Sequence, residues 1–124
     1  MIQNIKKKIL IVDDSEMVRN FHSYIIKMFG YEVETAENGA VALEKLLCDK
    51  FDLLVTDINM PKMDGYELIK NVQEQSIDIP IIIVSTEGDY KSSHIGEKPD
   101  PGIHMVKPTD PEKLVTTIRK LLLV

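Results

Sequence analysis

Short apolar segments alternate along the chain with segments whose apolar residues recur at helical spacing. Four of the apolar segments cover residues 8–12, 52–56, 81–84 and 103–106. Their length and composition are typical of strands. Residues 31–36 alternate apolar and charged side chains instead, which indicates a half-buried or edge strand. The pattern therefore predicts five strands.

The segments between the strands have the periodicity of amphipathic helices. Ser15 is placed to open the first helix and Gly30 to end it. Asp110, followed by Pro111, is placed to cap the last. We expect the third helix to span about residues 66–75. The apolar residues that define these four helices are Val18, Phe21, Ile25, Met28 and Phe29; Val41, Leu43, Leu46 and Leu47; Leu68, Ile69 and Val72; and Leu114, Val115, Ile118, Leu121 and Leu122.

The connection between residues 86 and 102 has the weakest helical pattern. Residues 90–95 could form a short helix, but Gly96, Pro99 and Pro101 crowd its end. Proline lacks an amide hydrogen and clashes with the preceding turn inside a helix. We therefore expect a fourth helix that ends by about Gly96.

Strands that alternate with helices predict a parallel α/β sheet, with helices on both faces and right-handed crossovers. The expected pattern is (βα)5, without an internal repeat or linker. A chain of 124 residues has the length of one ordinary domain, so we expect a single domain over residues 1–124.

Composition and charge exclude several classes of protein. The chain is 44% hydrophobic and 28% charged, with a formal net charge of −5, so non-specific binding to nucleic acid is not expected. No apolar stretch approaches the ~20 residues that span a bilayer, and the polar, basic start has no secretory pattern. A single cysteine, Cys48, fits a reducing, cytoplasmic setting; we expect it to be packed at a helix end.

Four of the predicted strands end in a polar, reactive side chain. Asp13 and Asp14 follow the first strand, Asp57 the third, Ser85 the fourth and Lys107 the fifth. The carboxyl ends of parallel strands line one crevice, where ligands bind. The sequence therefore brings three carboxylates, a hydroxyl and an ammonium group to one place.

That combination suits a divalent cation and a phosphoryl group. Mg2+ prefers oxygen ligands, and carboxylates crowded together without a cation raise one another's pKa values. Asp57 could act as a nucleophile, because carboxylates can form aspartyl phosphates. Lys107 would pair with phosphoryl oxygens, and Ser85 would donate a hydrogen bond. Any one of these acids could be a solvated loop residue, but together they favour the site.

Other polar residues carry weaker signals. Asp64 and Gly65 indicate a turn into the third helix. His22 lies on the first helix, and we expect it at the surface. His94 and His104 are too sparse for a zinc site.

These residues resemble a known family. Asp13-Asp14, the run from Asp57 to Gly65, Ser85 and Lys107-Pro108 are similar to the receiver domain of two-component response regulators, over about residues 7–123. The likeness is greatest to stand-alone chemotaxis receivers of the CheY type. It implies a doubly wound, flavodoxin-like sheet with strand order 2-1-3-4-5.

The resemblance also implies a chemistry for the crevice. Asp57 would accept phosphate from a histidine kinase or phosphotransfer protein. Asp14 and Asp57 would bind Mg2+, or another divalent cation such as Mn2+, directly, with Asn59 contributing its backbone carbonyl and Asp13 a water. Lys107 would hold the phosphate, and the Lys107-Pro108 peptide would be cis.

Further positions would control the switch. Ser85 stands at the family's switch Ser/Thr, and Asn59 and Glu87 at the two positions that tune the lifetime of the phosphoryl group; their identities imply a short-lived signal. His104 replaces the family's switch aromatic, and two prolines stand where the fourth helix usually continues. The resemblance places the readout on the fourth helix, fifth strand and fifth helix, so we expect weaker coupling to that surface.

Three functions remain open from the residues alone. The leading interpretation is a monomeric, phosphorylation-switched signalling module that binds a downstream protein and has no catalytic activity beyond its own phosphorylation and dephosphorylation. The second is a phosphatase or phosphotransferase with an aspartyl nucleophile, which would usually carry an acid at the position of Asn59. The third is a flavin or nucleotide binder, although the turn at residues 13–15 is acidic and lacks glycine.

Overall fold

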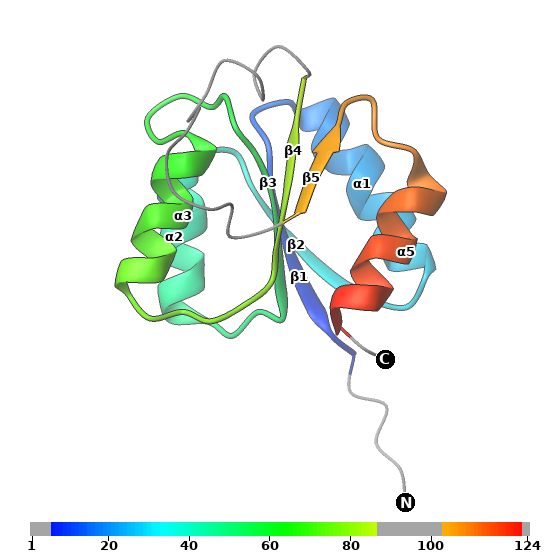
Figure 1. Cartoon of the computed structure of the whole chain (residues 1–124), viewed down its shortest axis with the longest axis horizontal. Helices are drawn as coiled ribbons and strands as arrows, with labels where there is room; N and C mark the ends of the chain where they lie inside the picture. The colour runs from blue at the N-terminus through cyan, green and yellow to red at the C-terminus, as the bar shows by residue number, and fades with distance from the viewer. Residues whose placement is uncertain (1–5, 87–102, 123–124) are drawn as a thin grey trace, which may run out of the picture.

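The computed structural model of the chain describes residues 6–86 and 103–122. Five parallel strands form one sheet in the order β2-β1-β3-β4-β5, which confirms the predicted topology (Figure 1). The strands are β1 (Lys8–Val12), β2 (Glu32–Ala36), β3 (Leu53–Asp57), β4 (Ile81–Ser85) and β5 (Ile103–Val106).

Helices cover both faces of this sheet, with α1 and α5 on one face and α2 and α3 on the other (Figure 1). Because successive side chains of a strand point to opposite faces, Leu10 and Leu54 pack toward α2 and α3, whereas Ile9 and Leu53 pack toward α1 and α5. The helices are α1 (Glu16–Met28), α2 (Gly39–Cys48), α3 (Gly65–Glu74) and α5 (Pro111–Leu122). The predicted fourth helix, with Glu87, Pro99 and Pro101, lies outside the described residues.

Side-chain caps start the helices immediately beyond the strand ends. Ser15 accepts a hydrogen bond from the Val18 amide at 3.3 Å, and Asn38 and Asp64 cap α2 and α3 in the same way. Asp110 accepts from the Glu112 amide at 3.3 Å, as predicted for the start of α5. These caps fix where each connection leaves the sheet.

The register of the sheet aligns the carboxyl ends of four strands, β1, β3, β4 and β5. Val12 pairs with Thr56, and Asp57 pairs with Val84, so the residues after β1 and at the end of β3 lie side by side. Ser85 pairs with Val106, the residue before Lys107. This register is what brings the polar strand ends together.

Two sequence-based expectations about side-chain placement are wrong. His22 is buried, with 4% of its surface exposed, because α1 turns His22, Ile25 and Ile26 toward the sheet. The helical spacing of α1 supports two apolar stripes, and only packing decides which one faces inward. Cys48 ends α2 as expected, but it is exposed rather than packed.

Candidate functional site

Three carboxylates meet at the carboxyl end of the sheet. Asp13, Asp14 and Asp57 each offer an oxygen, and these oxygens all lie within 4.8 Å of one another. Asp13 and Asp57 are buried, with 3% and 5% exposed surface, whereas Asp14 is exposed. The cluster is therefore embedded in the protein but open to solvent on the side of Asp14.

Local hydrogen bonds hold the two buried acids in place. Asp13 accepts from the Ser15 amide at 2.9 Å through its side chain, and its backbone carbonyl accepts from the Arg19 guanidinium at 2.7 Å. Asp57 accepts from the Ile58 amide at 2.8 Å. Sequence reasoning did not assign the role of Arg19, because nothing in a helical pattern indicates which residue folds back onto a strand end.

Lys107 lies between the two buried carboxylates. Its Nζ is 3.0 Å from Asp13 Oδ2 and 3.2 Å from Asp57 Oδ1. The Lys107 amide donates to the Ser85 carbonyl at 2.8 Å, and the Lys107-Pro108 peptide is cis, as predicted. Lys107 follows β5, the strand at one edge of the sheet, and its side chain reaches the acids that follow β1 and end β3.

The charges in this cluster are unbalanced. Burial, reinforced by the charge of Asp13, raises the pKa of Asp57 to about 6, although Lys107 and the Ile58 amide act in the opposite direction. Burial opposes the charged form of Lys107, but its hydrogen bond to Asp13 and the charge of Asp57 outweigh burial and raise the pKa of Lys107. Three acids face one ammonium group, and an added cation would relieve the excess negative charge.

Ser85 brings an unsatisfied hydroxyl to the same edge. Its side chain is 1% exposed, and its Oγ has no hydrogen-bond partner among the described residues. Buried polar groups are usually paired, so the free hydroxyl is available to a ligand that enters beside Asp57. Asn59 lies exposed on the loop after β3, and Glu87 is outside the described ranges.

Gly65 allows the loop after β3 to close tightly over the strand end. A Cβ at this position would lie 2.2 Å from the Asp57 carbonyl oxygen and 2.9 Å from Ile58 Cα. The Gly65 amide also donates to the Ile58 carbonyl at 2.7 Å. The sequence indicated a turn here, but only the structure shows that a side chain would displace the backbone of Asp57.

His104 lies on β5 and is half-buried. Its ring centroid is 6.5 Å from that of Tyr66, at the start of α3. His104 therefore contacts an element that begins beside the acidic cluster.

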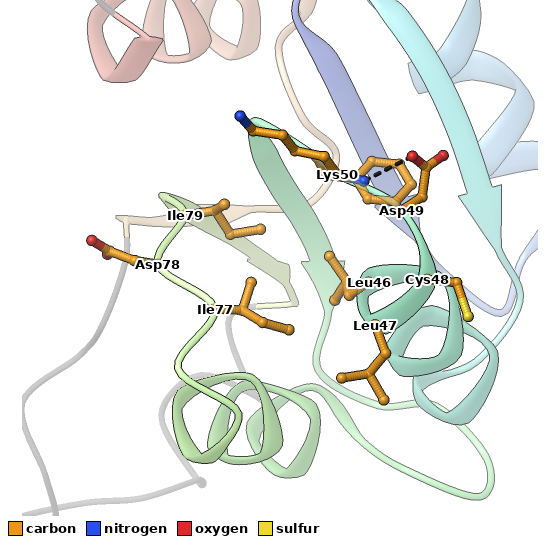
Figure 2. Close-up of a pocket in the computed structure, with 9 residues that line it drawn as sticks. Leu46, Leu47, Cys48, Asp49, Lys50, Ile77, Asp78 and Ile79 are labelled. Carbon is orange, nitrogen blue, oxygen red and sulfur yellow. Dashed lines mark hydrogen bonds between the residues drawn. The ribbon is translucent and has the colours of Figure 1, made fainter.

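A pocket of about 480 Å³ opens at the opposite end of the sheet (Figure 2). It lies between the end of α2, around Leu47 and Cys48, and the connection into β4, around Ile77 and Ile79. Its charged residues, among them Asp49 and Lys50, are exposed. The pocket lacks the buried charges of the carboxyl end, which makes the acidic cluster the better candidate site.

Comparison with known proteins places this geometry in a family. The response regulator receiver domain model matches residues 9–119. The chain is 39% identical, over 94% of its length, to the probable transcriptional regulator ycf27 of Cyanophora paradoxa, and it spans about half the length of the curated relatives it matches. The chemotaxis protein CheY4 of Vibrio cholerae is 36% identical, with a TM-score of 0.81 over 95% of this chain and 100% of that one.

A third similar structure is the response regulator TrrA of Thermotoga maritima in complex with Mg2+-BeF. It is 32% identical, with a TM-score of 0.80 over 94% of this chain and 99% of that one. The chain belongs to the receiver domain family of two-component response regulators. Receiver domains are signalling proteins, and the doubly wound fold predicted from the sequence is the fold of this family. Within the described ranges, no helix could cross a membrane.

Proposed function

We propose that this domain accepts a phosphoryl group on Asp57 from a histidine kinase or phosphotransfer protein, and thereby changes its binding to a downstream protein. The observation that carries the proposal is the contact of Lys107 with both Asp57 and Asp13, with the exposed Asp14 at the opening. A buried carboxylate that is held by one amide and reached by one lysine can be approached by a phosphoryl donor from the solvent side.

In the proposed step, an Asp57 carboxylate oxygen forms a bond to the phosphorus of a phosphohistidine. The bond between phosphorus and the histidine nitrogen breaks, and its electron pair stays on that nitrogen. Lys107, which contacts Asp57, would pair with the phosphoryl oxygens once that contact is released. Phosphoryl transfer depends mainly on such positioning and neutralisation of charge.

The donor set fits a hard divalent cation. Asp14 and Asp57 would contribute carboxylate oxygens, Asn59 its backbone carbonyl, and Asp13 a water-mediated contact. A bound Mg2+ would neutralise negative charge on the carboxylates and phosphoryl oxygens. The complex of the similar TrrA with Mg2+-BeF supports this assignment by likeness.

The proposed readout starts at Ser85. Its hydroxyl, which has no hydrogen-bond partner within the described part of the chain, would move toward the phosphoryl group and donate to it. β5, which pairs with β4 through Ser85 and Val106, would transmit the change. Because His104 stands where the family carries an aromatic residue, we expect weaker coupling to this surface. By the same family likeness, Asn59 and Glu87 support a short lifetime of the phosphoryl group on Asp57.

Labelling with acetyl phosphate and Mg2+, followed by intact mass, tests the proposal. Wild type should gain one phosphoryl group, Asp57→Asn none, and Asp78→Asn, an exposed acid before β4, the same as wild type. Steady turnover of a small phosphate ester would favour the phosphatase with an aspartyl nucleophile instead.

A further inference from the structure

The outer face of α1 carries an exposed apolar stripe. Four of the eight large hydrophobic residues exposed in the described ranges lie within this one helix. They are Met17, Phe21, Tyr24 and Met28, with 78%, 48%, 67% and 64% of their surface exposed. Their spacing of four, three and four residues places them on one side of the helix, as in the seam between two packed helices. We call these residues the α1 stripe.

The α1 stripe is distinct from the buried face of the helix. His22, Ile25 and Ile26 face the sheet, so the stripe is not needed for the core of this domain. Contiguous exposed apolar surface usually marks an interaction site. The question is which partner the stripe fits.

The order of side chains along the stripe is symmetric. Methionine stands at both ends and an aromatic ring at both central positions, so the sequence reads alike from either end of the helix. If a second α1 packs antiparallel to the first, Met17 meets Met28 of the other copy and Phe21 meets Tyr24. A two-fold interface requires this kind of self-complementarity.

The charges beside the stripe have the same symmetry. Glu16 and Lys27 are both exposed and lie eleven residues apart, close to three full turns, on one flank of the stripe. In an antiparallel pair, Glu16 of one copy lies near Lys27 of the other, twice per dimer. A parallel pair would instead place this flank on opposite sides of the seam in the two copies, so that Glu16 and Lys27 could not pair across it.

We propose that the α1 stripe is a homodimer interface in which two copies of this chain pack their α1 helices antiparallel. If each of the four stripe side chains has roughly 200 Å² of surface and buries about half of it, the two copies together bury about 800 Å² of accessible surface. That is at the low end for specific interfaces, so the dimer is weak and forms reversibly at roughly 10–500 µM. This inference does not depend on the chemistry of Asp57.

Sedimentation equilibrium over a concentration series tests the interface. Wild type should show a monomer–dimer equilibrium, and Phe21→Glu should weaken it by about tenfold or more, because it buries a charge at the centre. Leu47→Glu changes an equally exposed leucine on α2, at 54%, and should leave the equilibrium unchanged.

Charge exchange tests the antiparallel arrangement. Glu16→Lys and Lys27→Glu, each alone, place like charges together and should weaken the dimer by about threefold or more. The double variant restores both pairs and should return to wild-type affinity. Urea unfolding and far-ultraviolet circular dichroism of every variant check that the fold is intact, independently of Asp57 chemistry.

Several results would overturn the proposal. These are a wild-type monomer up to about 1 mM, a dimer insensitive to Phe21→Glu, or single charge variants that the double variant does not restore. A monomer in which Phe21→Glu instead slows phosphotransfer from a histidine phosphotransfer protein would assign the stripe to that donor. Loss of Asp57 labelling in wild type would refute the proposed function and leave the dimer test unaffected.

Discussion

At the residue scale, burial of the charged Asp57 carboxylate lowers the free energy of unfolding. Its pKa rises from 3.8 in the unfolded chain to about 6 when folded, mainly through burial. The folded state therefore binds more protons than the unfolded state between about pH 4 and 6. Without divalent cation, stability should fall as pH rises through that window, by about 1–3 kcal/mol.

Asp57→Asn should remove this destabilisation, because the amide carries no charge. In the presence of a chelator at pH 7.5, we expect the variant to unfold with a free energy about 1–3 kcal/mol higher than wild type, and at pH 4 with nearly the same value. Urea unfolding at both pH values measures the difference, with Asp78→Asn as the control. An equal gain in unfolding free energy at pH 4 and pH 7.5 would show that deprotonation of Asp57 does not cause the gain.

Asp14 tests the cation site with little effect on the fold, because its side chain is exposed. Asp14→Ala should weaken Mg2+ binding by about tenfold or more, since a hard cation loses a carboxylate ligand. Calorimetric titration with Mg2+ gives the affinity, and Asp78→Ala is the matched control. Unchanged affinity in Asp14→Ala would mean that the site is wrongly assigned.

Ser85 separates a signalling role from a structural one. Its Oγ has no partner among the described residues, so Ser85→Ala loses no hydrogen bond and should keep the unfolding free energy within about 0.5 kcal/mol. The same variant should lose most of the amide shifts that beryllofluoride induces on β5. A large loss of stability, or undiminished shifts, would contradict the proposed role.

At the element scale, the connection from β3 to α3 is fixed by Gly65. Gly65→Ala would place a methyl group against the Asp57 carbonyl and the Ile58 backbone, neither of which can move freely. We expect a loss of about 2 kcal/mol or more in unfolding free energy, and slower labelling of Asp57. Lys70→Ala, an exposed change later in the same helix, should have neither effect.

The same scale shows what the sequence could predict. Strand positions, their order by family likeness, the caps Ser15 and Asp110, and the inward residues of α3 are all confirmed. The burial of His22 was not predictable from spacing, because a polar residue on a helix with two apolar stripes is normally assigned to the surface. Neither was the contact of Lys107 with two acids, which depends on distances between strand ends.

At the scale of the whole molecule, the proposed function requires that a change at Asp57 reaches β5. The half-buried His104 contacts Tyr66, at the start of the helix that follows the Asp57 loop. A histidine ring is smaller than the aromatic side chain that the family resemblance predicts at this position. We therefore expect beryllofluoride to produce smaller amide shifts across β5 in wild type than in His104→Tyr. Equal shifts in both proteins would show that His104 does not limit the switch.

The central claim is that Asp57 is the phosphoryl acceptor of this receiver domain. Intact mass spectrometry after incubation with acetyl phosphate and Mg2+ tests it most directly, with Asp57→Asn and Asp78→Asn measured in parallel. The account predicts one added phosphoryl group on wild type and on Asp78→Asn, its loss when the cation is chelated, and none on Asp57→Asn. Labelling of Asp57→Asn to the wild-type level would contradict it.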